Sequence, residues 1–166
     1  MAGDKLSDTE LFRRFSPYIA GIGLRLLGRN AEVDDLVQEV FFAAFKQRDQ
    51  LRDVNAARSW LAVIAVRTAR HHLRRRRLRQ FVGLDTRKPA FELEDPRLAP
   101  DDCALLSRVY EVLDKISVEW RLAWTLRYIE GEQLEQVAER CGCSRATAKR
   151  RIAAAHARLL SELEHG

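Results

Sequence analysis

Two blocks of helical periodicity, separated by a proline-rich segment, restrict the fold of this chain more than any other feature of its sequence. In the first block apolar residues such as Leu11, Phe15 and Ile19 recur every three or four positions, which is typical of amphipathic helices. Residues 82–102 hold three of the four prolines and show no such period. We therefore expect an all-α protein of two small helical bundles joined by a flexible linker. The expected parts are residues 1–80, the linker 81–102, and residues 103–166.

An arginine-rich stretch ends the first block. Residues 67–80 contain seven arginines, two histidines and no acidic residue. The apolar residues Leu61, Ala65, Ala69 and Leu73 form an i, i+4 ladder that leads into this stretch. The stretch is therefore the second half of a helix whose first half is anchored in a core. Such a segment suits contact with phosphates. The alternative is that it only complements the helix dipole and keeps the protein soluble. His71 and His72 are adjacent and face different sides of the helix, so they make a poor metal pair.

The second block ends in a pattern typical of a helix-turn-helix. In "EQLEQVAERCGCSRATAKRRIAAAHARLL" one short apolar stripe precedes Gly142, which permits a tight turn. Ser144 can cap the following helix, whose stripe of Ala148, Ile152 and Ala155 faces inward. Arg150 then points outward, where arginine can meet phosphates or guanine edges. Many helical hairpins with this pattern bind nothing, so the pattern alone leaves DNA binding open.

Several function classes are disfavoured by the composition. The chain has a polar start and no apolar run near the roughly 20 residues that a bilayer span needs, so we expect a cytoplasmic protein without membrane insertion. The three cysteines, Cys103, Cys141 and Cys143, are expected to be reduced thiols. We find no nucleophile-base pairing, metal constellation or phosphate-cradling glycine loop. The sequence therefore predicts a protein that is not an enzyme and has no cofactor and no metal.

The two blocks together resemble a known family. "DDLVQEVF", "SWLAVIAVRTARHHLRRRR" and "LEQVAERCGCSRATAKRRI" occur in the order and spacing of the extracytoplasmic-function group of bacterial sigma factors. The resemblance implies a subunit that binds core RNA polymerase and directs promoter-specific initiation. The first block would dock on polymerase and open the −10 element, and the second would read the −35 element. Many members of the group are held by an anti-sigma factor, which makes one a possible partner here.

The resemblance also assigns site residues by position. Asp35, Gln38 and Glu39 match the helix that docks on core polymerase. Asp53 and Asn55 match the loop that captures a flipped base of the melted non-template strand. The residues that match contacts to the −10 element are Arg67, Arg70, Arg74, Arg75, Arg76 and Arg77. Those that match contacts to the −35 duplex are Ser144, Arg145, Thr147, Lys149, Arg150 and Arg151.

The chain departs from the family at a few of these positions. Arg67 stands where the family usually has asparagine, His71 where it has aspartate, and Ala154 where an arginine is common. The linker acids, which include Glu92 and Asp95, would resemble RNA phosphates near the polymerase cleft or simply form an acidic tether. Two alternatives stay open: a helix-turn-helix transcriptional regulator that acts without polymerase docking, and a helical module that binds only protein.

Overall fold

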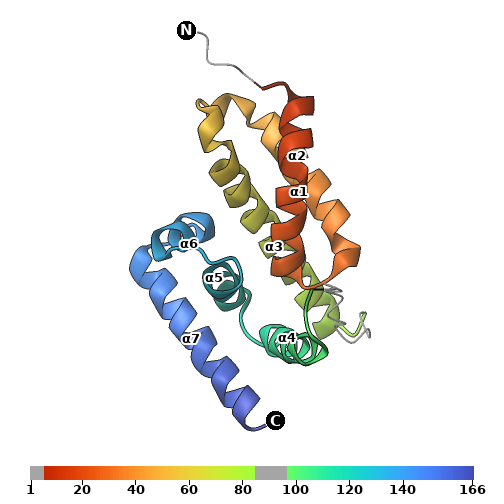
Figure 1. Cartoon of the computed structure of the whole chain (residues 1–166), viewed down its shortest axis with the longest axis vertical. Coiled ribbons are helices and arrows are strands. Elements are labelled where there is room, and N and C mark those ends of the chain that lie inside the picture. Colours follow the sequence, from red (N-terminus) through yellow and green to blue (C-terminus); the bar gives the residue numbers. More distant parts are fainter. Residues whose placement is uncertain (1–5, 85–96) are drawn as a thin grey trace.

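The computed structural model describes residues 6–84 and 97–166, and every regular element in these ranges is helical (Figure 1). The all-α prediction is thus confirmed. Residues 85–96 of the expected linker, including Glu92, Glu94 and Asp95, lie outside the described residues. The α-helices are α1 (Asp8–Leu27), α2 (Val33–Lys46), α3 (Ala57–Phe81), α4 (Pro100–Leu113), α5 (Val118–Tyr128), α6 (Leu134–Cys141) and α7 (Arg145–Glu164).

Helix α1 begins and ends at residues whose chemistry fixes its length. Ser7 and Glu10 form a capping box, in which each side chain accepts a hydrogen bond from the other residue's backbone N–H. The backbone N–H of Ser7 lowers the pKa of the Glu10 carboxyl because it stabilises the charged form. Gly28 then ends the helix in the left-handed conformation, with φ of 71°.

Helices α1, α2 and α3 form the first block, with their apolar stripes turned inward. The ladder of α3 from Leu61 to Leu73 is buried, as the spacing predicts. Phe41 of α2 is almost fully buried and meets Phe12 edge to face, with ring centroids 4.8 Å apart. Phe42, which follows it, is 62% exposed. The first half of α3 is therefore fixed in a core, which positions the arginine-rich half that follows.

Helices α4 to α7 form the second block, and α6 and α7 are the expected helix-turn-helix. Gly142 adopts the left-handed conformation that makes the turn, and Ser144 accepts a hydrogen bond from the backbone N–H of Thr147. Ala148 and Ile152 of α7 are buried. The turn, the cap and the inward stripe are all confirmed.

The two blocks pack against each other. Helices α5 and α6 lie beside α3 (Figure 1). Leu122 and Leu126 of α5 and Val137 of α6 belong to the same buried cluster as Leu61 of α3. The sequence predicted two bundles but gave no sign of this shared core.

The C-terminal end of α1 is the polar part of the contact between the blocks. The last carbonyl groups of a helix have no hydrogen-bond donor within the helix. Here side chains of the second block donate to them. Tyr110 donates its hydroxyl hydrogen to the carbonyl of Arg25 at 2.5 Å. Arg121 donates to the carbonyls of Leu26 and Leu27 at 3.2 and 2.9 Å. Burial lowers the pKa of Arg121 and raises that of Tyr110 to about 12, since each loses hydration of its charged form.

Gly28 makes this contact possible, so its replacement is expected to be costly. A methyl group there would lie 2.6 Å from the Tyr110 ring, on a backbone that L-residues seldom adopt. Gly28→Ala should lower the free energy of unfolding by about 2–4 kcal/mol, from left-handed strain and overpacking together. Gly83 has the same φ but nothing within 4 Å, so Gly83→Ala should cost only about 1 kcal/mol. Urea denaturation of both variants measures the difference; equal losses would contradict the steric argument.

Candidate nucleic-acid interface

The second half of α3 carries most of the arginines that the sequence predicts to contact DNA. Arg67, Arg74, Arg75 and Arg77 are exposed on it, and Arg70 is partly buried. Because one rigid helix carries all of them, their charges keep a fixed spacing along its axis. Exposed guanidinium groups carried by a helix can contact phosphates of a nucleic-acid backbone.

Arg76 differs from its neighbours, because it is 4% exposed. Its Nη1 donates to the carbonyl of Leu27 at 3.0 Å, and its Nη2 pairs with the carboxylate of Glu32. Asp114 of the second block lies 3.7 Å from Nη1. The sequence predicted that Arg76 contacts DNA, but in this conformation its guanidinium binds partners within the protein. The reason is its register, since Arg76 continues the inward ladder one turn beyond Leu73.

Glu119, at the start of α5, binds three arginines from two helices. Its carboxylate oxygens lie 2.7 Å from Arg70, 3.0 Å from Arg74 and 3.1 Å from Arg151. Arg70 and Arg74 come from α3, whereas Arg151 comes from α7. Arg70 also donates to the carbonyl of Cys141 at 2.9 Å. We call Glu119 with these three arginines the Glu119 clasp.

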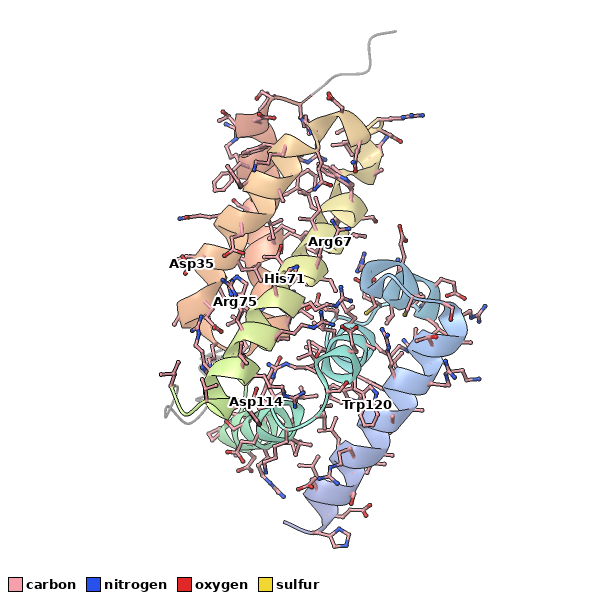
Figure 2. The ribbon with its side chains drawn as sticks, turned by 180° about the vertical axis from the view of Figure 1, so that it is seen from behind. Asp35, Arg67, His71, Arg75, Asp114 and Trp120 are labelled. Atoms are coloured by element: carbon pink, nitrogen blue, oxygen red, sulfur yellow. The ribbon has the colours of Figure 1, made fainter. Side chains whose placement is uncertain are left out.

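Helix α2 presents an acidic face. Asp35, Gln38 and Glu39 are all exposed, and Asp35 lies in the first turn, where a carboxylate also complements the helix dipole. Glu39 Oε1 lies 3.2 Å from His72 Nε2 and 3.7 Å from Arg75 Nη2, so this carboxylate also touches α3. Asp35 lies on the far side of α3 from α5 and α6 (Figure 2). The acidic face is thus separate from the contact between the blocks.

The loop before α3 borders a cleft of about 440 Å³. Asn55 lines it together with Tyr18 and Arg58, and the guanidinium of Arg58 stacks 4.2 Å from the Tyr18 ring centroid. Asp53 caps the short 3-10 helix η3 (Val54–Ala56) by accepting from the backbone N–H of Asn55 at 2.9 Å. The cleft therefore combines an aromatic face with polar side chains, which is the chemistry that an unstacked base requires.

Helix α7 presents a second basic face. Arg145, Lys149 and Arg150 are exposed on it, and Arg150 donates to the Thr147 hydroxyl at 3.2 Å. Ser144 and Thr147 stand at its start, where backbone N–H groups and the helix dipole favour an anion. Arg151 turns away from this face into the Glu119 clasp.

Sequence reasoning missed the acidic residues that hold the blocks together. Glu119 and Asp114 lie outside the motifs, and nothing local marks them as partners of distant arginines. Arg121 looks like an ordinary surface residue of α5 but is buried. A partial signal existed in the helical register, which places Arg76 and Arg121 on the inward sides of their helices.

The thiols and histidines form no metal site in the described parts of the chain, where no group of three or more possible ligands gathers. All three cysteines are free thiols. Burial raises the pKa of Cys141 to about 12, so this thiol stays protonated at neutral pH. Within residues 6–84 and 97–166, none of the helices has the length and apolar character to cross a membrane.

Comparison with known proteins decides the family. Residues 11–79 match the sigma-70 region 2 family, and residues 106–159 match the family of sigma-70, region 4. The chain belongs to the extracytoplasmic-function group of RNA polymerase sigma factors. The sigma factor is 28% identical to the ECF RNA polymerase sigma-E factor of Haemophilus influenzae, over 90% of this chain and 84% of that one. It is 29% identical to the RNA polymerase sigma-H factor of Pseudomonas aeruginosa, over 90% and 82%.

Solved structures show the same fold for this sigma factor. The sigma factor RpoE of Bartonella quintana, solved in complex with the anti-sigma factor NepR, matches with a TM-score of 0.70 and 23% identity, over 92% of this chain and 93% of that one. CnrH, solved in complex with the cytosolic domain of CnrY, matches with a TM-score of 0.60 and 23% identity, over 95% and 88%. A regulator without polymerase docking is not favoured, because it has no need of region 2.

Proposed function

We propose that this sigma factor docks on core RNA polymerase through the acidic face of α2 and binds promoter DNA through the basic faces of α3 and α7. The separation of these charges carries the proposal. Asp35, Gln38 and Glu39 lie on α2, whereas the exposed arginines lie on α3 and α7. A carboxylate face repels DNA and suits a basic protein surface, whereas a guanidinium row suits phosphates.

The two basic faces read different parts of the promoter. Arg67, Arg70, Arg74, Arg75 and Arg77 of α3 contact the −10 element, where the phosphate backbone releases counterions on binding. The residues of α7 that contact the −35 duplex are Ser144, Arg145, Thr147, Lys149, Arg150 and Arg151. Arginine and lysine supply most of the affinity there, and side chains that reach base edges add the specificity.

The cleft beside Asn55 receives one base of the melted non-template strand. Extruding a base costs a few kcal/mol of stacking, which a pocket must offset with new contacts. Tyr18 supplies an aromatic surface, Arg58 a cation stacked on it, and Asn55 a polar group, while Asp53 caps the short 3-10 helix that carries Asn55. Base selection in the −10 element is assigned to these residues.

An anti-sigma factor is a second proposed partner. A groove of about 850 Å³ runs along α7 and is lined by apolar side chains, among them Ile152, Ala153 and Leu160. Arg145 and Lys149 border the same groove, so a partner helix seated in it would cover residues that are assigned to the −35 duplex. Acidic side chains on that helix would complement this border. The sigma factor itself acts in the cytoplasm and contributes no enzymatic step; the polymerase performs the synthesis.

Run-off transcription with purified protein, core polymerase and fragmented genomic DNA tests this function. Discrete start sites that are absent with core alone are expected. Asp35→Ala combined with Glu39→Ala should remove them, because the docking face then lacks both carboxylates. Glu111→Ala combined with Glu164→Ala removes two exposed carboxylates of the second block and should leave the start sites intact. Absence of protein-dependent transcripts, together with duplex binding that needs no polymerase, would contradict the proposal.

A further inference from the structure

An exposed phenylalanine lies on the outer face of α2, among the residues that the proposed function assigns to polymerase docking. Phe42 is 62% exposed, whereas its neighbour Phe41 is buried and packs on the rings of Phe12 and Phe45. Because each residue turns the helix by about 100°, one step along the chain moves the side chain from the core to the outer face. The fold therefore does not use the Phe42 ring for its own core.

Phe42 lies at the centre of this outer face. Asp35, Gln38 and Glu39 precede it on α2 and Lys46 follows it, and all four are exposed. At helical spacing Phe42 points within about 20° of Asp35, while Gln38 and Glu39 flank it on opposite sides. We call these five residues the outer stripe. Asp35, at one end of the stripe, lies away from α5 and α6 (Figure 2).

The outer stripe has an uneven distribution of charge. Its carboxylates lie in the N-terminal half, and at the C-terminal end the Lys46 ammonium lies 4.2 Å from the centroid of the Phe42 ring. This cation–π contact restricts the ring, so less conformational entropy is lost when a partner covers it. An aromatic side chain at the centre with polar groups at the rim is the usual anatomy of a protein interface. DNA does not suit this surface, since the carboxylates that flank the ring repel phosphates.

We propose that Phe42 is the apolar anchor of polymerase docking, and that its ring enters an apolar depression of the polymerase beside basic side chains that pair with Asp35 and Glu39. The inference rests on the proposed function for the identity of the partner. The partner surface that fits has basic groups opposite the N-terminal half of the outer stripe and none opposite Lys46, because like charges there would repel. The charge distribution of the stripe thus fixes the direction in which α2 lies on the polymerase, and Phe42 supplies the contact that excludes water.

Equilibrium binding of the full-length protein to core polymerase tests the anchor. Phe42→Ala should weaken binding by about thirtyfold or more, as the loss of a buried aromatic anchor does. Phe42→Leu keeps most of the apolar volume and should weaken binding by less than about tenfold. Leu105→Ala is the matched control, because it removes an apolar side chain that is 51% exposed on α4, and it should leave the affinity unchanged.

The salt dependence of binding separates the apolar anchor from the charged rim. The loss caused by Phe42→Ala should be the same at low and high salt, because salt does not screen an apolar contact. The loss caused by Asp35→Ala should shrink as the salt concentration rises, because the ion pairs that it removes are then already screened. Urea denaturation should give nearly the same midpoint for Phe42→Ala as for the unaltered protein, since the ring is exposed.

Three results would overturn the anchor. Binding that Asp35→Ala with Glu39→Ala removes, but that Phe42→Ala leaves intact, would overturn it and keep the proposed function. Absence of polymerase binding by the unaltered protein would refute the proposed function and the anchor with it. A dimer of the free protein that Phe42→Ala abolishes, together with unchanged affinity for polymerase, would assign the ring to a second copy of this chain. Analytical ultracentrifugation measures that last outcome.

Discussion

Replacing Arg76 with alanine is expected to lower the free energy of unfolding by about 3–5 kcal/mol, because it leaves buried partners without their counter-charge. The guanidinium is 4% exposed, pairs with Glu32 and donates to the carbonyl of Leu27. Without it, the Glu32 carboxylate keeps its charge in a partly buried site, and the Leu27 carbonyl loses one of its donors. Urea denaturation followed by circular dichroism measures the shift in midpoint.

Arg75 provides the matched control for this loss. It stands next to Arg76 in the same helix, but its side chain is 54% exposed and its nearest carboxylate is 3.7 Å away. Arg75→Ala should change the free energy of unfolding by less than about 0.5 kcal/mol. Similar effects for the two variants would mean that burial of Arg76 contributes nothing to the free energy of unfolding.

Replacing Arg74, Arg75 and Arg77 together with glutamine is expected to weaken promoter complexes of the polymerase-bound sigma factor by about a hundredfold or more. Each lost phosphate contact reduces the slope of log K against log salt by about one, so the slope should become shallower by about three. Affinity for core polymerase should stay unchanged, because docking is assigned to α2. Competition binding with labelled promoter at several salt concentrations measures the first effect, and titration with polymerase measures the second.

Arg76 is left out of that substitution because its loss would destabilise the protein, and a destabilised protein imitates a DNA-binding defect. A matched variant replaces three other exposed arginines, Arg13, Arg108 and Arg158, with glutamine. It lowers the net charge equally and should leave the salt slope nearly unchanged. Loss of polymerase binding in parallel with promoter binding would count against the assignment of α3 to DNA.

The helices were predictable from sequence because local rules determine them. The apolar stripes of α1 and α3 recur at helical spacing, and Ser144 and Gly142 have the cap and turn chemistry that the structure confirms. The family resemblance placed the docking and DNA-binding residues, and those roles stay predictions. The motifs that carry this resemblance lie in both blocks, and those of the first block include the arginine-rich stretch.

The contact between the blocks was not predictable, since its partners are distant in sequence and individually ordinary. Arg70 and Glu119 are 49 residues apart, and Arg25 and Glu130 are 105 apart. Arginine is also counted as a surface residue in any hydropathy pattern, although its planar group can be buried wherever carbonyls and carboxylates surround it. Arg76 and Arg121 are buried at such places, and only their helical register hinted at it.

The Glu119 clasp makes the contact between the blocks depend on charge as well as on apolar packing. Glu119 pairs with Arg70 and Arg74 across the two blocks, while Leu122 and Val137 are buried in the apolar cluster that the blocks share. Salt screens the ion pairs, whereas it does not weaken the apolar cluster. Ionic strength therefore sets part of the strength with which the two blocks are held together.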